Sequence, residues 1–116
     1  LQFVERIDSS RVGLNFDIGH AYCVGEDPQD WVVKMSEHTV HYHLEDIAAS
    51  RVHEHLIPGR GAIDFPATLT AIAKTGYDDW LTVELYPYVE SPDEAAKQAR
   101  TFLLETLAEL NLSESA

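Results

Sequence analysis

The histidines of this chain gather in one stretch and are interleaved with acidic residues. All six lie between positions 20 and 55, and five of them fall in three short segments: FDIGH (16–20), HYHLED (41–46) and VHEHLIPGRG (52–61). Imidazole nitrogens and carboxylate oxygens are ligands that divalent Zn, Mn, Co and Fe accept. A metal site is therefore our first hypothesis, and the alternative is a set of unrelated surface and core histidines.

Three parts of the chain show a strand pattern followed by a helix pattern. Short apolar runs predict strands over 12–17, 39–44 and 80–86, and spaced apolar residues predict helices over 28–37, 64–74 and 92–110. Asp64 and Ser91 are the expected N-caps, with Pro66 and Pro92 in the first turns. This order implies parallel strands with right-handed crossovers, in a doubly wound sheet or in part of an eightfold barrel. Both folds bind ligands at the carboxyl ends of their strands.

Each predicted strand carries a pair of polar residues two positions apart. Alternate residues of a strand point to the same face, so neighbouring strands should form a deeper polar layer and an upper one. The deeper layer comprises Asn15, His41 and Thr82, and the upper layer comprises Asp17, His43 and Glu84. Two carboxylates on a buried strand face repel each other unless a cation neutralises them. We therefore interpret the upper layer as ligands of a divalent ion. For Asp17 alone, the alternative is a carboxylate that caps the next helix.

Two loops carry the remaining candidate residues. His20 is expected in a loop that curls over the end of the first strand, with Gly19 supplying the conformational freedom, and it can reach the same pocket. His53 and His55 lie in the loop after the second strand. They could bind a second ion together with His20, contact substrate or merely solvate the loop.

The same long loop contains PGRG at 58–61, a turn sequence whose glycines would let the backbone approach a ligand, including a phosphate. Arg51 and Arg60 are the cations expected near the pocket. Each could hold a substrate oxygen or balance the acidic loop.

Composition narrows the class of protein. The 116 residues, 45% of them apolar and 24% charged, suit one ordinary globular domain. The formal charge of −12 repels phosphate backbones, so we do not expect nucleic acid as a partner. No apolar run approaches the roughly 20 residues of a membrane span, so we expect no membrane association and a cytoplasmic protein. The single cysteine, Cys23, cannot form an internal disulfide.

Four segments in this order resemble a known family: FDIGH, HYHLED, HLIPGRGAIDF and GYDDWLTVELYP. They are similar to the xylose-isomerase-like TIM barrel superfamily, which includes sugar phosphate isomerases and epimerases, ketose 3-epimerases, inosose dehydratases and the endonuclease IV group (AP endonuclease family 2). The likeness runs from about residue 12 to residue 100. It implies an α/β fold in which residues 1–116 are a single C-terminal piece, the last three βα units of a (β/α)8 barrel. The absence of an initial methionine and the helical pattern at 1–7 fit that expectation.

A three-stranded piece of a barrel would have two unpaired sheet edges. We therefore expect the chain alone to be inactive and either poorly stable or associated with copies of itself as a homo-oligomer.

The resemblance also implies roles for individual residues. Asp17, His43 and Glu84 correspond to ligands of a catalytic divalent ion, which is Mn, Co, Mg or Zn, and His20 to a residue that binds substrate or a further metal. A further glutamate ligand expected from an earlier strand is absent from this sequence.

The loop after the second strand differs between the branches of the superfamily. A basic residue there holds substrate in the epimerase branch, which points to Arg51. An Asp-x-His pair there binds zinc in the endonuclease branch; this chain has His53 and His55 instead, a departure at the first position.

The function implied is a divalent-metal-dependent isomerase or epimerase of a sugar or sugar phosphate, with a small sugar or polyol as substrate. Proton transfer would proceed through a metal-stabilised enediolate. Glu84 and His20 are the expected catalytic residues, and His20, Arg51 and His55 the expected substrate contacts. The alternatives are an endonuclease IV-like phosphodiester hydrolase, an inosose-type dehydratase and a non-catalytic sugar-binding or metal-binding relative.

Overall fold

A single parallel sheet organises the chain. The computed structural model describes residues 1–112, and its strands are β1 (Leu14–Asp17), β2 (Thr39–Leu44) and β3 (Leu81–Val83), in the order β1-β2-β3. The predicted parallel α/β arrangement is confirmed, and β2 has its predicted bounds. The strand predicted over 80–86 is shorter in the structure. Trp80, with 81% of its surface exposed, lies before the first strand residue, and after the last one the chain turns, where Tyr88 N donates to Leu85 O.

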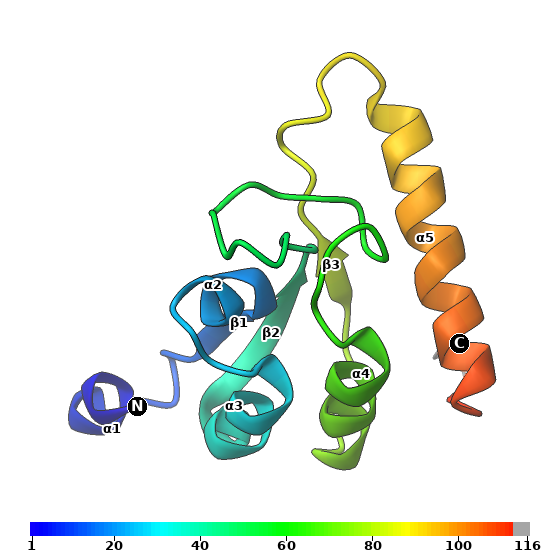
Figure 1. The fold of residues 1–116 in the computed structure, drawn as a ribbon. Coiled ribbons are helices and arrows are strands. Elements are labelled where there is room, and N and C mark those ends of the chain that lie inside the picture. The colour runs from blue at the N-terminus through cyan, green and yellow to red at the C-terminus, as the bar shows by residue number, and fades with distance from the viewer. Residues whose placement is uncertain (113–116) are drawn as a thin grey trace.

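Helices connect and cover the strands (Figure 1). They are α1 (Gln2–Ile7), α2 (Ile18–Cys23), α3 (Pro28–Met35), the 3-10 turn Ser36–His38, α4 (Phe65–Lys74) and α5 (Pro92–Glu109). The predicted Asp64 cap is confirmed, because its Oδ1 accepts a hydrogen bond of 2.9 Å from Ala67 N. Ser91 occupies the N-cap position of α5, but its side chain makes no capping hydrogen bond. Helix α2 was not predicted, and it occupies the place of the expected loop around His20.

The two faces of the sheet differ in character. Phe16, Tyr42 and Leu44 are buried beneath the helices, in a core with residues of α2 to α5: Ile18, Val32, Phe65, Leu69, Ile72 and Leu103. The alternate residues of β1 and β2 point to the opposite face, and they are the polar ones of the predicted layers. The apolar face thus fixes the strands, and the polar face remains open for a site.

The long loop between β2 and α4 arches over the carboxyl ends of the strands (Figure 1). Its anchor is the buried Asp46, whose carboxylate accepts hydrogen bonds from four backbone N–H groups: those of Ile47, Gly59, Gly61 and Ile63, at 2.8 to 3.1 Å. The glycine amides of PGRG therefore bind this carboxylate, and the idea that they cradle a phosphate is wrong. A second anchor is Ile57, which packs on Ala95 and Ala99 of α5.

Among residues 1–112, no helix is both long enough and apolar enough to cross a membrane.

Candidate metal centre at the carboxyl ends of the strands

The three predicted ligands of the upper layer come together. One ligand atom from each of Asp17, His43 and Glu84 lies within 4.8 Å of the other two. His43 Nδ1 is 3.4 Å from Glu84 Oε2. Two carboxylates and one imidazole from three consecutive segments therefore face a common point, as the alternation of the strands predicted.

The layers themselves are not level across all three strands. Asp17 pairs with His43 and Asn15 with His41, as expected, but His43 pairs with Thr82. Glu84 follows β3 and lies two residues beyond the level of His43. The predicted layers are therefore wrong for the third strand, because parallel strands of a barrel-like sheet are staggered and not level. The glutamate side chain nevertheless reaches His43.

Asp17 also fulfils the alternative that the sequence left open. It is the N-cap of α2, and its Oδ1 accepts a hydrogen bond of 2.8 Å from His20 N. Its Oδ2 lies 3.4 Å from His20 Nδ1. One oxygen of this carboxylate thus caps the helix, and the other lies on the side of the histidine ring.

Gly19 has a different role from the one predicted. It belongs to helix α2 and is buried, so it does not provide an unusual backbone conformation. A Cβ atom at this position would stand 2.0 Å from Glu45 Oε1. Glycine is therefore needed here because a glutamate side chain occupies the space beside the helix.

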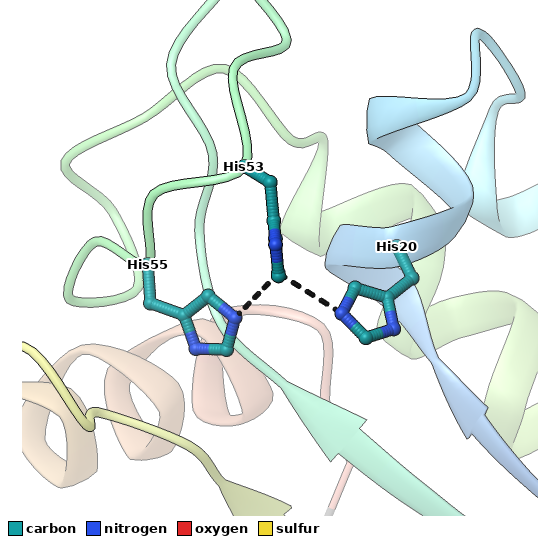
Figure 2. Close-up of side chains that lie close together, drawn as sticks. All are labelled: His20, His53 and His55. Carbon is teal, nitrogen blue, oxygen red and sulfur yellow. Dashed lines mark hydrogen bonds between the residues drawn. The ribbon is translucent and has the colours of Figure 1, made fainter.

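His20, His53 and His55 form a compact group (Figure 2). His53 Nε2 lies 2.9 Å from His20 Nε2 and 3.0 Å from His55 Nε2. His55 Nδ1 donates to the carbonyl of Glu84 at 3.1 Å, which leaves a lone pair on His55 Nε2. If the Nε2–H of His53 donates to that lone pair, His53 Nε2 has no lone pair left to accept a hydrogen bond from His20 Nε2. Neutral rings cannot satisfy both contacts, whereas a cation between the three nitrogens would.

Glu45 belongs to the site although we did not single it out from the sequence. Its side chain is fully buried, and neither carboxylate oxygen has a hydrogen-bond partner among the described residues. Burial first, and then the neighbouring carboxyls of Asp17 and Glu84, raise the pKa of Glu45 to about 9. A signal was present: Glu45 continues the alternation of His41 and His43 past the end of β2.

The two arginines expected near the pocket are each held by another part of the chain. The guanidinium of Arg51 is stacked over the Tyr22 ring, 4.0 Å from its centroid, and donates to the Tyr22 carbonyl at the end of α2. Arg60 donates to Gln98 of α5. Arg51 is therefore held against α2, the helix that carries His20, and Arg60 against α5.

Comparison with known proteins identifies the family. Residues 1–106 match the family model described as xylose isomerase-like TIM barrel. The chain belongs to this xylose isomerase-like family. The expected resemblance and the predicted fold class, parallel βα units of a TIM barrel, are thereby confirmed.

Two curated relatives illustrate the likeness. The rhizopine catabolism protein MocC of Rhizobium meliloti is 36% identical over 94 residues, which cover 67% of this chain and 29% of MocC. An inosose dehydratase of Lacticaseibacillus casei is 32% identical over 127 residues, covering 94% of this chain and 42% of the dehydratase. The chain thus spans less than half the length of these relatives.

Solved structures of the xylose isomerase-like family agree. A D-tagatose 3-epimerase-like protein is 31% identical with a TM-score of 0.83, covering 96% of this chain and 40% of that one. The IolI protein, whose crystal structure holds a zinc atom, is 24% identical with a TM-score of 0.77, covering 94% and 42%; at that identity it supports the fold alone.

Proposed function

We propose that this protein is part of a divalent-metal-dependent enzyme that isomerises or epimerises a sugar or polyol. The observation that carries the proposal is the convergence of Asp17, His43 and Glu84, whose ligand atoms lie within 4.8 Å of one another. Two carboxylates with one imidazole are a donor set that suits Mn, Co, Zn or Mg. The relatives support a polyhydroxylated substrate, since one is an inosose dehydratase and another a D-tagatose 3-epimerase-like protein.

When bound, a divalent ion supplies Lewis-acid polarisation of a carbonyl and a neighbouring hydroxyl. Glu84 provides the acid/base group, because its side chain is 40% exposed at the end of β3 and can accept a proton from a substrate carbon and return it. His43 Nδ1 lies 3.4 Å from that carboxylate, so both groups can face the same ion.

Two residues would bind the substrate oxygens. His20 is 57% exposed on α2, with its ring oriented by Asp17. Arg51 keeps further N–H donors beside the one directed at Tyr22, and these can hold a hydroxyl. His55, the third expected contact, lies deeper, with its ring centroid 4.7 Å from that of Tyr86 and its side chain 2% exposed, so we assign it no substrate oxygen.

The test is a screen of ketoses and inososes in deuterated water with the full-length protein and added Mn²⁺ or Co²⁺. Turnover should incorporate solvent deuterium at the reacting carbon. Glu84→Gln should fold normally and lose about 10²-fold to 10⁴-fold in turnover. Glu90→Gln, an exposed glutamate in the loop before α5, is the matched control and should keep full activity. Retained turnover in Glu84→Gln would contradict the proposal, and loss of water from the substrate would identify a dehydratase.

A metal-dependent phosphodiester hydrolase is the second candidate, and the histidine group of Figure 2 favours it because three further imidazoles lie beside the first ligands. The net charge of −12 opposes a DNA substrate. Hydrolysis of an abasic-site duplex by the zinc-loaded protein, abolished by His53→Gln, would support this candidate. If the zinc-loaded protein does not hydrolyse the duplex, the sugar isomerase or epimerase remains the proposed function.

A further inference from the structure

A buried carboxylate without a partner lies beside the proposed metal site. Glu45 is 0% exposed, and neither of its oxygens has a hydrogen-bond partner among residues 1–112. An unpaired charge in such a place is strongly unfavourable, so a buried carboxyl is kept protonated or paired with a donor or a cation, and a cation can replace the proton. In the described part of the chain, the backbone N–H of Gly19 is the one donor that acts on this carboxyl, and it makes no hydrogen bond of normal geometry with it.

The charge of the surroundings points to a cation. The negative charges of Asp17 and Glu84 raise the pKa of Glu45, and no lysine or arginine is among the groups that affect it. One divalent ion held by Asp17 and Glu84 balances two carboxylates and leaves the third uncompensated. A second cation would balance it.

His55 is positioned to share that cation. Its Nε2 lies 4.0 Å from Glu45 Oε1, and its side chain is 2% exposed. Its Nδ1 donates to the carbonyl of Glu84, an arrangement that fixes the tautomer and aims the Nε2 lone pair away from that carbonyl. One ligand atom from each of Glu45, His55 and Glu84 lies within 4.8 Å of the other two.

The backbone is adapted to this carboxylate. Gly19 leaves the space that Glu45 Oε1 occupies, since a Cβ atom there would be 2.0 Å from it. The glutamate is therefore accommodated by the neighbouring helix and is not a surface residue turned inward.

We propose that Glu45, His55 and Glu84 bind a second divalent cation, of the Mn, Co or Zn class, and that the Glu84 carboxylate is shared with the ion of Asp17 and His43. This inference rests on the proposed function, because it assumes the first ion. A centre with two ions clamps two neighbouring oxygens of a substrate, which suits a diol or a hydroxy-ketone. The trihistidine group is the competing location, since it uses the same nitrogen of His55.

The test counts Mn²⁺ ions. The protein is stripped with a chelator, dialysed against Mn²⁺, and examined by elemental analysis and electron paramagnetic resonance. We expect two ions with an exchange-coupled spectrum, because a shared carboxylate holds them about 4 Å apart. Glu45→Gln, a neutral side chain of the same shape, should bind one ion with an uncoupled spectrum. His53→Gln, the matched control for the competing location, should still bind two coupled ions.

The outcomes separate this inference from the proposed function. No bound ion in the unmodified protein would overturn both. One ion, lost in Asp17→Asn and unaffected by Glu45→Gln, would leave the proposed function and overturn the second site. Two ions that survive Glu45→Gln and fall to one in His53→Gln would place the second cation in the trihistidine group and overturn this assignment.

Discussion

The Oε1 atom of Glu45 lies 4.0 Å from the Nε2 atom of His55, and both side chains are almost fully withdrawn from solvent. The pair joins the residue that follows β2 to the loop that arches over the sheet. It also lies next to Glu84, whose carbonyl accepts from His55 Nδ1. The loop and the ends of two strands are thus joined at one point, and changes there should be felt in stability as well as in metal binding.

The metal-free protein should lose stability as the pH rises. The pKa of Glu45 is raised from 4.5 to about 9, so between those values the folded state keeps a proton that the unfolded chain releases. The free energy of unfolding therefore falls with increasing pH in that window, by at most about 1.4 kcal/mol per pH unit. Glu45→Gln has no such proton and should show a flatter profile. Urea unfolding with excess chelator, across that pH range, measures both.

The exposed Glu54, in the same loop, offers the control for this prediction. Glu54→Gln should follow the unmodified protein at every pH. Superimposable profiles for Glu45→Gln and the unmodified protein would mean that the buried carboxyl does not titrate as described.

Gly19→Ala should destabilise the protein through Glu45. Alanine is favoured over glycine in a helix by about 1 kcal/mol, but the added Cβ would stand 2.0 Å from Glu45 Oε1. We expect a net loss of about 1 to 3 kcal/mol, typical of overpacking. In the Glu45→Ala background the clash is absent, and the same change should be neutral or stabilising. A double-mutant cycle measured by urea unfolding gives the coupling, and an equal cost in both backgrounds would refute it.

Asp46→Ala should be more damaging than the loss of an ordinary helix cap. The substitution leaves four backbone N–H groups without their acceptor, at Ile47, Gly59, Gly61 and Ile63. Hydrogen bonds to a buried charge contribute roughly 1.5 to 3 kcal/mol each, and water can replace only some of them, so we expect a loss of at least about 3 kcal/mol. Asp64→Ala, which removes the cap of α4, is the comparison and should cost about 1 kcal/mol. Similar losses for the two variants would speak against Asp46 as the anchor.

Local signals were enough to predict most of the elements. The run 39–44 alternates apolar and polar residues, and it forms β2 with those bounds. Asp64 with Pro66 marks the start of α4, because cap and first-turn residues act within one turn. The pairing of Asp17 with His43 followed from strand alternation and the parallel order, whereas Glu84 reaches them from two residues beyond the predicted level.

The remaining features depend on contacts between distant segments. Helix α2 has only six residues, too few for an apolar repeat, and Gly19 resembled a turn residue until Glu45 was found against it. The level of Glu84 relative to His43 depends on the stagger of the strands, which no single strand records. The binding of the PGRG amides to Asp46 likewise depends on how the loop folds back.

Elemental analysis of the purified full-length protein tests whether Asp17, His43 and Glu84 bind a divalent ion. Asp17→Asn is the decisive variant, because asparagine still caps α2 while the charge is removed. Asp30→Asn, at an exposed position of α3, is the control. We predict at least one equivalent of Mn, Co, Zn or Mg in the unmodified protein and in Asp30→Asn, and about one equivalent fewer in Asp17→Asn and in His43→Gln. Protein without bound metal, or a metal content that both of those substitutions leave unchanged, would contradict this assignment.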